Sequence, residues 1–132
     1  MQRVKYILFT LILLICIVLT ACSQEKAYEV TKYEIKVTDI ENELQLEVDY
    51  EISNYSDEDY YFTFVFPSYI QEELITRVGI GQMLANSSVS GVEVIAVSKD
   101  GAEMTEETID AILNGELPAI TQILIGKTVS LK

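Results

Sequence analysis

The side chains that could do chemistry in this sequence are mostly carboxylates. The 132 residues contain 21 Asp and Glu against 9 Lys and Arg, and His is absent. A nucleophilic triad needs a general base, which is usually His, and a zinc site is usually built from His and Cys. Carboxylates without such partners attract calcium, basic peptides and basic protein surfaces. We therefore expect a protein with no enzymatic activity and no organic cofactor.

The densest acidic segment is Asp57, Glu58 and Asp59, which follows Asn54 in a stretch of turn-forming residues. Three adjacent carboxylates could supply some of the oxygens that calcium takes. However, the spacing is not that of an EF-hand loop, and adjacent side chains point apart. Two interpretations stay open, a calcium site in a calcium-stabilised structural domain and a solvated turn whose side chains accept backbone N–H groups.

A second set of carboxylates lies on one face of a predicted strand, because residues two apart point the same way. Its members are Glu43, Glu47, Asp49 and Glu51. Like charges on one sheet face repel each other, so this face could bind a cationic peptide or a basic patch of a membrane protein. The alternative is a solvated outer face that Lys32 and Lys36 partly neutralise. The net charge of -12 argues against nucleic acid, whose affinity for proteins depends on Lys and Arg.

Aromatic residues follow the acidic turn. Phe62, Phe64 and Phe66 alternate along the chain and are predicted to lie in the core. Tyr60 and Tyr61 stand next to the turn, and tyrosine is enriched in protein interfaces. We therefore expect these two tyrosines at the rim of a partner-binding surface.

Residues 1–22 form a segment whose composition differs from that of the rest of the chain. A positively charged start and an apolar run from Tyr6 to Leu19 are typical of signal peptides. The sequence Leu19-Thr20-Ala21-Cys22 matches the lipobox at every position, so the chain resembles bacterial lipoproteins. The resemblance implies cleavage before Cys22 and a diacylglyceryl lipid on its thiol. The protein would then lie on the outer face of the cell membrane, or in the outer membrane if the organism has one. An uncleaved transmembrane anchor is the alternative, and it too would place residues 23–132 outside.

The elements that must position these residues are mainly strands. Leu44, Leu46, Val48, Tyr50 and Ile52 alternate with polar residues, which predicts a half-buried strand. Similar alternation predicts a strand around 33–37, and 60–66 forms an aromatic strand that Pro67 ends. Because a loop of about six residues separates them, the strands at 43–52 and 60–66 are expected to form a hairpin.

Further elements follow along the chain. Ser68 and Gln71 fit a capping box for a short helix over 69–76, and 89–97 predicts a strand buried in part on both faces. Thr105 is a predicted N-cap and Gly115 a predicted C′ residue of a helix over 106–114. A last hairpin is expected around Gly126, with strands at 120–125 and 127–131.

Together these elements predict a mainly β protein, an antiparallel immunoglobulin-like sandwich with one or two short helices in the connections. The expected organisation is a signal peptide at 1–21, a lipidated tether at 22–27 and one domain at 28–132. Residues 46–57 resemble immunoglobulin-like domains of bacterial surface lipoproteins, which implies an accessory or ligand-binding module. We expect a membrane-anchored protein or peptide interaction module. The alternative is an immunity-type lipoprotein that captures a cationic antimicrobial peptide.

Overall fold

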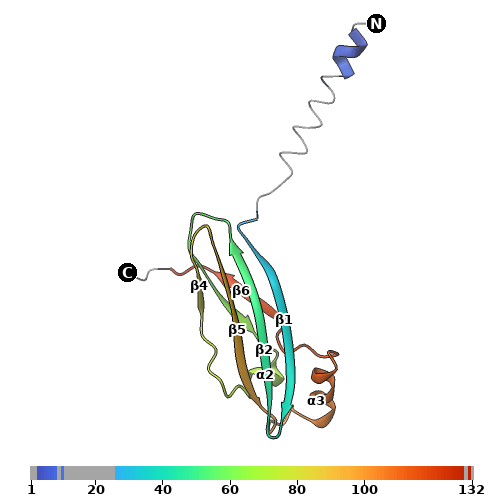
Figure 1. The fold of residues 1–132 in the computed structure, drawn as a ribbon, viewed down its shortest axis with the longest axis vertical. Helices are drawn as coiled ribbons and strands as arrows, with labels where there is room; N and C mark the ends of the chain where they lie inside the picture. The colour runs from blue at the N-terminus through green and yellow to red at the C-terminus, as the bar shows by residue number, and fades with distance from the viewer. Residues whose placement is uncertain (1–2, 9, 11–25, 130, 132) are drawn as a thin grey trace.

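The computed structural model describes residues 3–8, 10, 26–129 and 131. Residues 3–8 are helical, and the predicted lipobox with Cys22 lies outside the described residues. Within the described part of the chain, no helix is long and apolar enough to cross a membrane. The folded domain follows as an elongated body that the chain enters at one end (Figure 1).

The domain consists of two antiparallel sheets with three strands each, so the predicted mainly β sandwich is confirmed. The long sheet has the order β1-β2-β5, and its strands are β1 (Tyr28–Ile40), β2 (Glu43–Asn54) and β5 (Ser87–Ser98). The short sheet has the order β4-β3-β6, and its strands are β4 (Gly81–Met83), β3 (Tyr60–Val65) and β6 (Gln122–Gly126). With β1, β2 and β5 as strands A, B and E, and β3, β4 and β6 as C, C′ and F, this is the strand order of an immunoglobulin-like sandwich.

The core lies between the sheets and is formed by the alternating apolar residues of β2 and β3. Leu44, Leu46, Val48, Tyr50 and Ile52 are all buried, as their spacing predicts. Across from them lie the buried rings of the short sheet, with the Tyr50 ring centroid 5.4 Å from that of Phe62 and 5.5 Å from that of Phe64. Such tilted and edge-on aromatic pairs add to the burial of apolar area.

The predicted hairpin between β2 and β3 is wrong. β2 pairs with β1 on one side and β5 on the other, while β3 pairs with β4 and β6 in the other sheet. The residues after Asn54 therefore cross from one sheet to the other. The crossing places the apolar face of β2 against that of β3, whereas a hairpin would leave both faces on the same side of one sheet.

The first predicted helix is shorter than expected. Helix α2 covers Ser68–Gln71, its N-cap is Pro67, and no side chain caps it, so the capping box does not form. Beyond α2 the chain pairs with the edge of β5 instead of continuing the helix. The Ser98 N–H donates to the Glu73 carbonyl at 2.7 Å, and the Ile75 N–H donates to the Ala96 carbonyl at 2.9 Å. Tertiary pairing thus replaces the local helical preference.

The second predicted helix is confirmed. Helix α3 covers Glu106–Leu113, and the Thr105 side chain accepts the Thr108 N–H as an N-cap. Gly115 has a φ of 78°, the left-handed conformation expected of a C′ glycine. Ile109 and Ile112 are buried against the core, and the helix packs near β1 at the end of the domain far from the chain entry (Figure 1).

Two strand predictions need correction. β5 is not buried on both faces, because Ile95 and Val97 are buried while Val92 and Val94 remain 58% and 50% exposed. Its inner-face residues fill the core, whereas its outer-face valines share the open face of the long sheet with the carboxylates of β2. The predicted C-terminal hairpin reduces to β6, since residues 127–129 form no strand.

Candidate functional site

The candidate site is the outer face of the long sheet. Because the even-numbered residues of β2 from Leu44 to Ile52 fill the core, the odd-numbered ones must point outward. The structure therefore brings the four predicted carboxylates together in one row along β2. Their order along the strand is Glu43, Glu47, Asp49 and Glu51. Gln45 stands between the first two, so the last three carboxylates form an uninterrupted series.

On the β1 side, the carboxylate row meets residues of both charges. Lys36 lies opposite Glu47, Glu34 opposite Asp49, and Lys32 opposite Glu51. The Lys32 Nζ is 2.8 Å from the Asp49 Oδ2, a diagonal contact across the two strands. This hydrogen bond, followed by the charges of Asp49, Glu34 and Glu51, raises the pKa of Lys32. The predicted neutralisation by Lys32 is therefore present for Asp49.

On the β5 side, the row has no basic neighbour. Val94 lies opposite Glu47, Val92 opposite Asp49, and Ser90 opposite Glu51. Both valines are at least half exposed. The acidic row thus has a charged border on β1 and an apolar border on β5. A ligand that combines basic groups with an apolar side would contact both the carboxylates and the valines.

The predicted tyrosines do not belong to this face. Tyr60 and Tyr61 lie in the short sheet and point to opposite faces of β3. Tyr60 makes an edge-on contact with Tyr28, with ring centroids 5.5 Å apart, and the Lys127 Nζ lies 5.0 Å from the Tyr60 centroid. Tyr61 lines a hollow of about 480 Å³ on the outer face of the short sheet, next to Ile80 and Leu124. The expected partner-binding residues are thus divided between separate surfaces.

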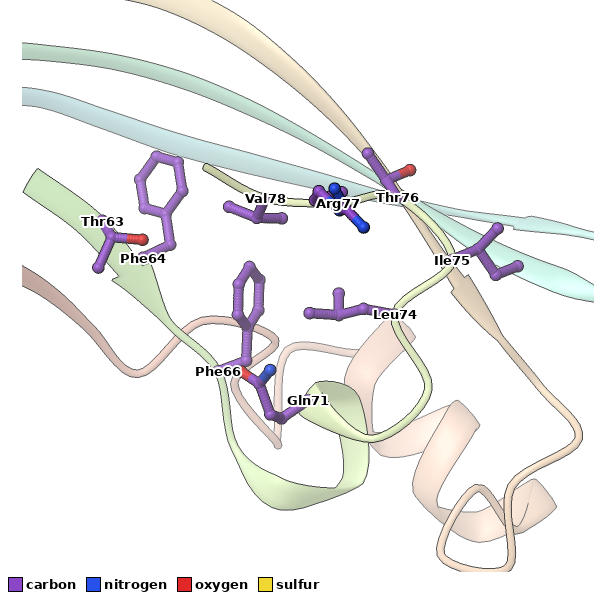
Figure 2. Close-up of a pocket in the computed structure, with 9 residues that line it drawn as sticks. All are labelled: Thr63, Phe64, Phe66, Gln71, Leu74, Ile75, Thr76, Arg77 and Val78. Carbon is purple, nitrogen blue, oxygen red and sulfur yellow. The ribbon is translucent and has the colours of Figure 1, made fainter. Parts of the chain in front are cut away.

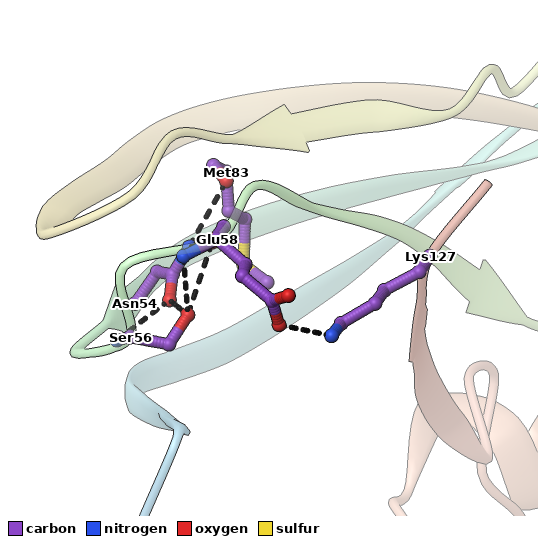
Figure 3. A network of polar contacts seen from close by, with 5 residues as sticks. All are labelled: Asn54, Ser56, Glu58, Met83 and Lys127. Carbon is purple, nitrogen blue, oxygen red and sulfur yellow. Dashed lines mark hydrogen bonds and ion pairs between the residues drawn. The ribbon is translucent and has the colours of Figure 1, made fainter.

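The acidic turn directs two of its carboxylates to different partners. The Asp59 Oδ1 accepts the Ala85 N–H at 2.9 Å, whereas the Glu58 carboxylate pairs with Lys127 (Figure 3). Across the described ranges, no group of three His, Cys, Asp or Glu side chains is arranged to hold a metal ion. For Asp59 the geometry is that of a turn side chain bound to a backbone N–H.

The residue that organises this turn is Asn54, whose place in the sequence predicted no more than a turn former. Its side chain is 1% exposed. Its Nδ2 lies 2.8 Å from the Glu58 carbonyl oxygen and 3.1 Å from that of Met83, and its Oδ1 accepts the Ser56 N–H at 3.0 Å. Asn54 therefore joins the end of β2 to the turn and to β4 in the other sheet (Figure 3). The available signal was an Asn at a strand end with Ser two residues later, a typical Asx turn.

A second hollow lies between β3 and the segment that follows α2 (Figure 2). Its volume is about 600 Å³. Phe64, Phe66, Leu74 and Val78 form its apolar walls, and Arg77 is its one charged lining residue. The lining offers no nucleophile paired with a base, so it gives no basis for a covalent reaction.

Comparison with known proteins finds no match for this chain, whether with family models, with curated proteins or with solved structures. Function must therefore follow from the surfaces of the domain. Among these, the outer face of the long sheet has the most distinctive chemistry. It combines a row of carboxylates along β2 with exposed valines on β5.

Proposed function

We propose that this chain is a bacterial lipoprotein whose sandwich domain is a non-catalytic binding module at the outer face of the cell membrane. The lipobox sequence ending in Cys22 supports the anchor. The observation that carries the binding role is the outer face of the long sheet, where the carboxylates of β2 lie beside Val92 and Val94. Its expected partner is a basic protein surface or a basic peptide.

The acidic row of β2 begins near the end where the chain enters the domain and extends from there toward the far end. Lys26 follows Cys22 by so few residues that even an extended tether spans only about 14 Å. The Tyr55 N–H donates to the Ala27 carbonyl at 2.8 Å, so the turn at 55–59 lies at the end where the chain enters. The strands of the long sheet extend from there over roughly 40 Å, and their outer face is open along its length (Figure 1).

The anchor is tested by Cys22→Ala in the producing cell. Without the thiol no diacylglyceryl group can be attached, so we expect the protein either in the medium or as an uncut precursor. Cell fractionation and the mass of the intact protein distinguish these states from the normal one. A processed Cys22→Ala protein that is still held by the membrane would contradict the lipid anchor.

The binding role is tested by removing the carboxylates of the outer face without changing their shape. The face variant carries Glu43→Gln, Glu47→Gln, Asp49→Asn and Glu51→Gln. A matched control removes the same number of exposed charges elsewhere, through Glu72→Gln, Glu103→Gln, Asp110→Asn and Glu116→Gln. Because both variants have the same net charge, any difference between them comes from the outer face.

The assay is a pull-down from solubilised membranes with the full-length protein in lipid nanodiscs, at low and high salt, followed by mass spectrometry. We expect a basic partner that is retained by the control variant, lost by the face variant and released at high salt. Equal loss from both variants would show that net charge alone attracts the partner. That result would contradict a binding role for this face.

Capture of a cationic antimicrobial peptide is the second candidate, and the exposed Val92 and Val94 favour it. Such a peptide presents basic and apolar groups together, and the outer face presents carboxylates and valines together. Cells that produce the natural protein should then survive a higher concentration of an amphipathic cationic peptide than cells that produce the face variant. Equal survival would exclude this candidate.

A further inference from the structure

The outer edge of β5 exposes unpaired backbone groups. In an antiparallel sheet, the N–H and C=O of one residue point to the same side of the strand, and this side alternates along the chain. Ala96 and Ser98 bond outward to residues 73–76, so the even-numbered residues of β5 face away from β2. Ser90, Val92 and Val94 therefore turn their N–H and C=O groups outward, and no other described residue hydrogen-bonds them.

The segment that hydrogen-bonds this edge of β5 reaches only its C-terminal end, at Ala96 and Ser98. Thr76 is the last residue of the segment that bonds β5, with the Ala96 N–H donating to its Oγ1 at 2.9 Å. Figure 2 shows Thr76 against β5 and then Arg77 and Val78 leading away from it toward the short sheet. The opposite edge of the long sheet, β1, carries Lys32 and Lys36, charged residues that commonly protect an edge strand from pairing. β5 has no charged residue on its outer face between Ser88 and Val94.

A carboxylate of the inner face stands at the same edge. Glu93 points inward, between Gly91 and Ile95, because the odd-numbered residues of β5 face the core. It is half-buried, and it forms no ion pair with any residue that the structure describes. A strand added to β5 would place one of its own inward side chains about 5 Å from Glu93. A basic side chain at that position would neutralise the carboxylate.

We propose that the edge of β5 from Ser88 to Val94 binds an extended segment rich in Lys or Arg, which adds as a further strand to the long sheet. Backbone pairing with Ser90, Val92 and Val94 would supply affinity, as in other cases of strand addition. Charge complementarity selects a basic segment, because Glu93 lies on the inner side and Glu47 and Asp49 lie one strand away on the outer side.

Charge also argues against a second copy of the chain as the occupant. Two antiparallel β5 strands side by side in register around Glu93 would bring two copies of this carboxylate opposite each other, and like charges across a pair of strands are destabilising. The inference deepens the proposed function and rests on it, since it names the mode of binding and the chemistry of the bound segment.

The test uses a blocked heptapeptide, Lys-Lys-Lys-Thr-Lys-Thr-Lys, and the full-length protein in zwitterionic lipid nanodiscs. Val92→Pro removes one outward N–H and places a ring at the edge, while the ladder to β2 keeps its bonds. Val92→Thr is the matched control, because it keeps both the branched shape and the N–H. We expect Val92→Pro to weaken binding at least about tenfold, equivalent to the loss of one or two backbone hydrogen bonds. Val92→Thr should bind as the natural protein does.

Hydrogen exchange gives a second readout that needs no variant. The peptide should slow exchange in the segment that contains Ser90, Val92 and Val94, and leave exchange in β1 unchanged. A peptide with every Lys replaced by Gln should have neither effect. If Val92→Pro fails to fold, as judged by circular dichroism, this protection in the natural protein still decides the question.

The outcomes separate this inference from the proposed function. If the peptide binds Val92→Pro but not the face variant, and does not slow hydrogen exchange in β5, strand addition would be overturned and docking on the outer face would remain. Failure of the peptide to bind, together with a membrane partner that depends on the face, would also overturn strand addition alone. If the peptide does not bind and the membrane partner binds the face variant as well as the natural protein, both strand addition and the binding role of the outer face would be overturned.

Discussion

The two sheets of the domain differ in regularity and in the surface that each presents to solvent. The long sheet has strands of 12 or 13 residues, with regular alternation of buried and outward residues in β2 from Glu43 to Ile52, and its outer face carries a row of carboxylates. The short sheet has strands of 3 to 6 residues, and its outer face exposes Ile80 and Leu124 beside Tyr61. The long sheet therefore presents a charged outer surface. The short sheet covers the other side of the core and presents an apolar outer surface.

The largest effect on stability should come from the inner face of the long sheet. Leu46 is fully buried in β2, and Leu46→Ala should lower the free energy of unfolding by about 2–5 kcal/mol through lost burial and a cavity. The matched control is Leu124→Ala on the outer face of the short sheet, where the side chain is 60% exposed and the change should stay within about 0.5 kcal/mol. Urea unfolding measures both. Similar losses for the two variants would contradict the assignment of the core to the inner faces.

The junction between the sheets should be the next most sensitive place. Asn54→Ala removes the amide that contacts the carbonyl groups of Glu58 and Met83. We expect a loss of about 1–3 kcal/mol, because buried backbone groups then lack a partner. Asn42→Ala, at an exposed turn of the same long sheet, should change stability little. If both variants unfold at the same urea concentration, the Asn54 network does not hold the sheets together.

Packing within the short sheet gives a smaller expected effect. A Cβ at Gly81 would overlap the ring of Phe62, so Gly81→Ala should force this buried ring to move and destabilise the domain by about 1–2 kcal/mol. Gly126 in β6 has nothing within 4 Å of such a Cβ, so Gly126→Ala is the matched control with little expected change. Thermal unfolding of both variants tests whether β4 is held this closely against β3. Equal melting temperatures would show that it is not.

Local burial patterns and helix ends were more predictable from sequence than the pairing of strands, for a physical reason. The burial of β2 follows from the alternation of its own residues, and α3 follows from a local N-cap at Thr105 and a left-handed Gly115. These signals lie within a few residues of the structure that they specify. The strand order depends instead on contacts between segments that lie far apart in the sequence, and β2 pairs with β1 on one side and β5 on the other, which leaves no edge for β3.

The candidate site shows the same division. The alternation of side chains along β2 predicted that the odd-numbered carboxylates lie on one face, because the even-numbered residues from Leu44 to Ile52 are all apolar. The same alternation separates Tyr60 from Tyr61, because neighbouring residues of a strand point to opposite faces. Val92 and Val94 were hidden within an apolar run that suggested burial on both faces. They are exposed because their side chains lie on the outer face of the long sheet, beside the carboxylates of β2.

Removal of the inward carboxylate of β5 should give the smallest effect, which depends on pH. Burial raises the pKa of Glu93, so the fold favours its protonated form. The stability that protonation adds is fully present below the ordinary carboxyl pKa and is lost as pH rises through the raised pKa. At pH 7 the charged Glu93 therefore disfavours folding, and Glu93→Gln should raise the melting temperature there.

Near pH 4 this gain should disappear, because Glu93 of the natural protein is then largely protonated. Glu47→Gln on the exposed outer face is the control for the simple loss of one negative charge, and its gain at pH 7 should be smaller. If Glu93→Gln gains no more than Glu47→Gln, burial of the carboxylate does not disfavour folding. If it does gain more, the inner face of the long sheet keeps a charge that weakens the fold, as inward-pointing charges do where they protect an open edge from pairing with its own kind.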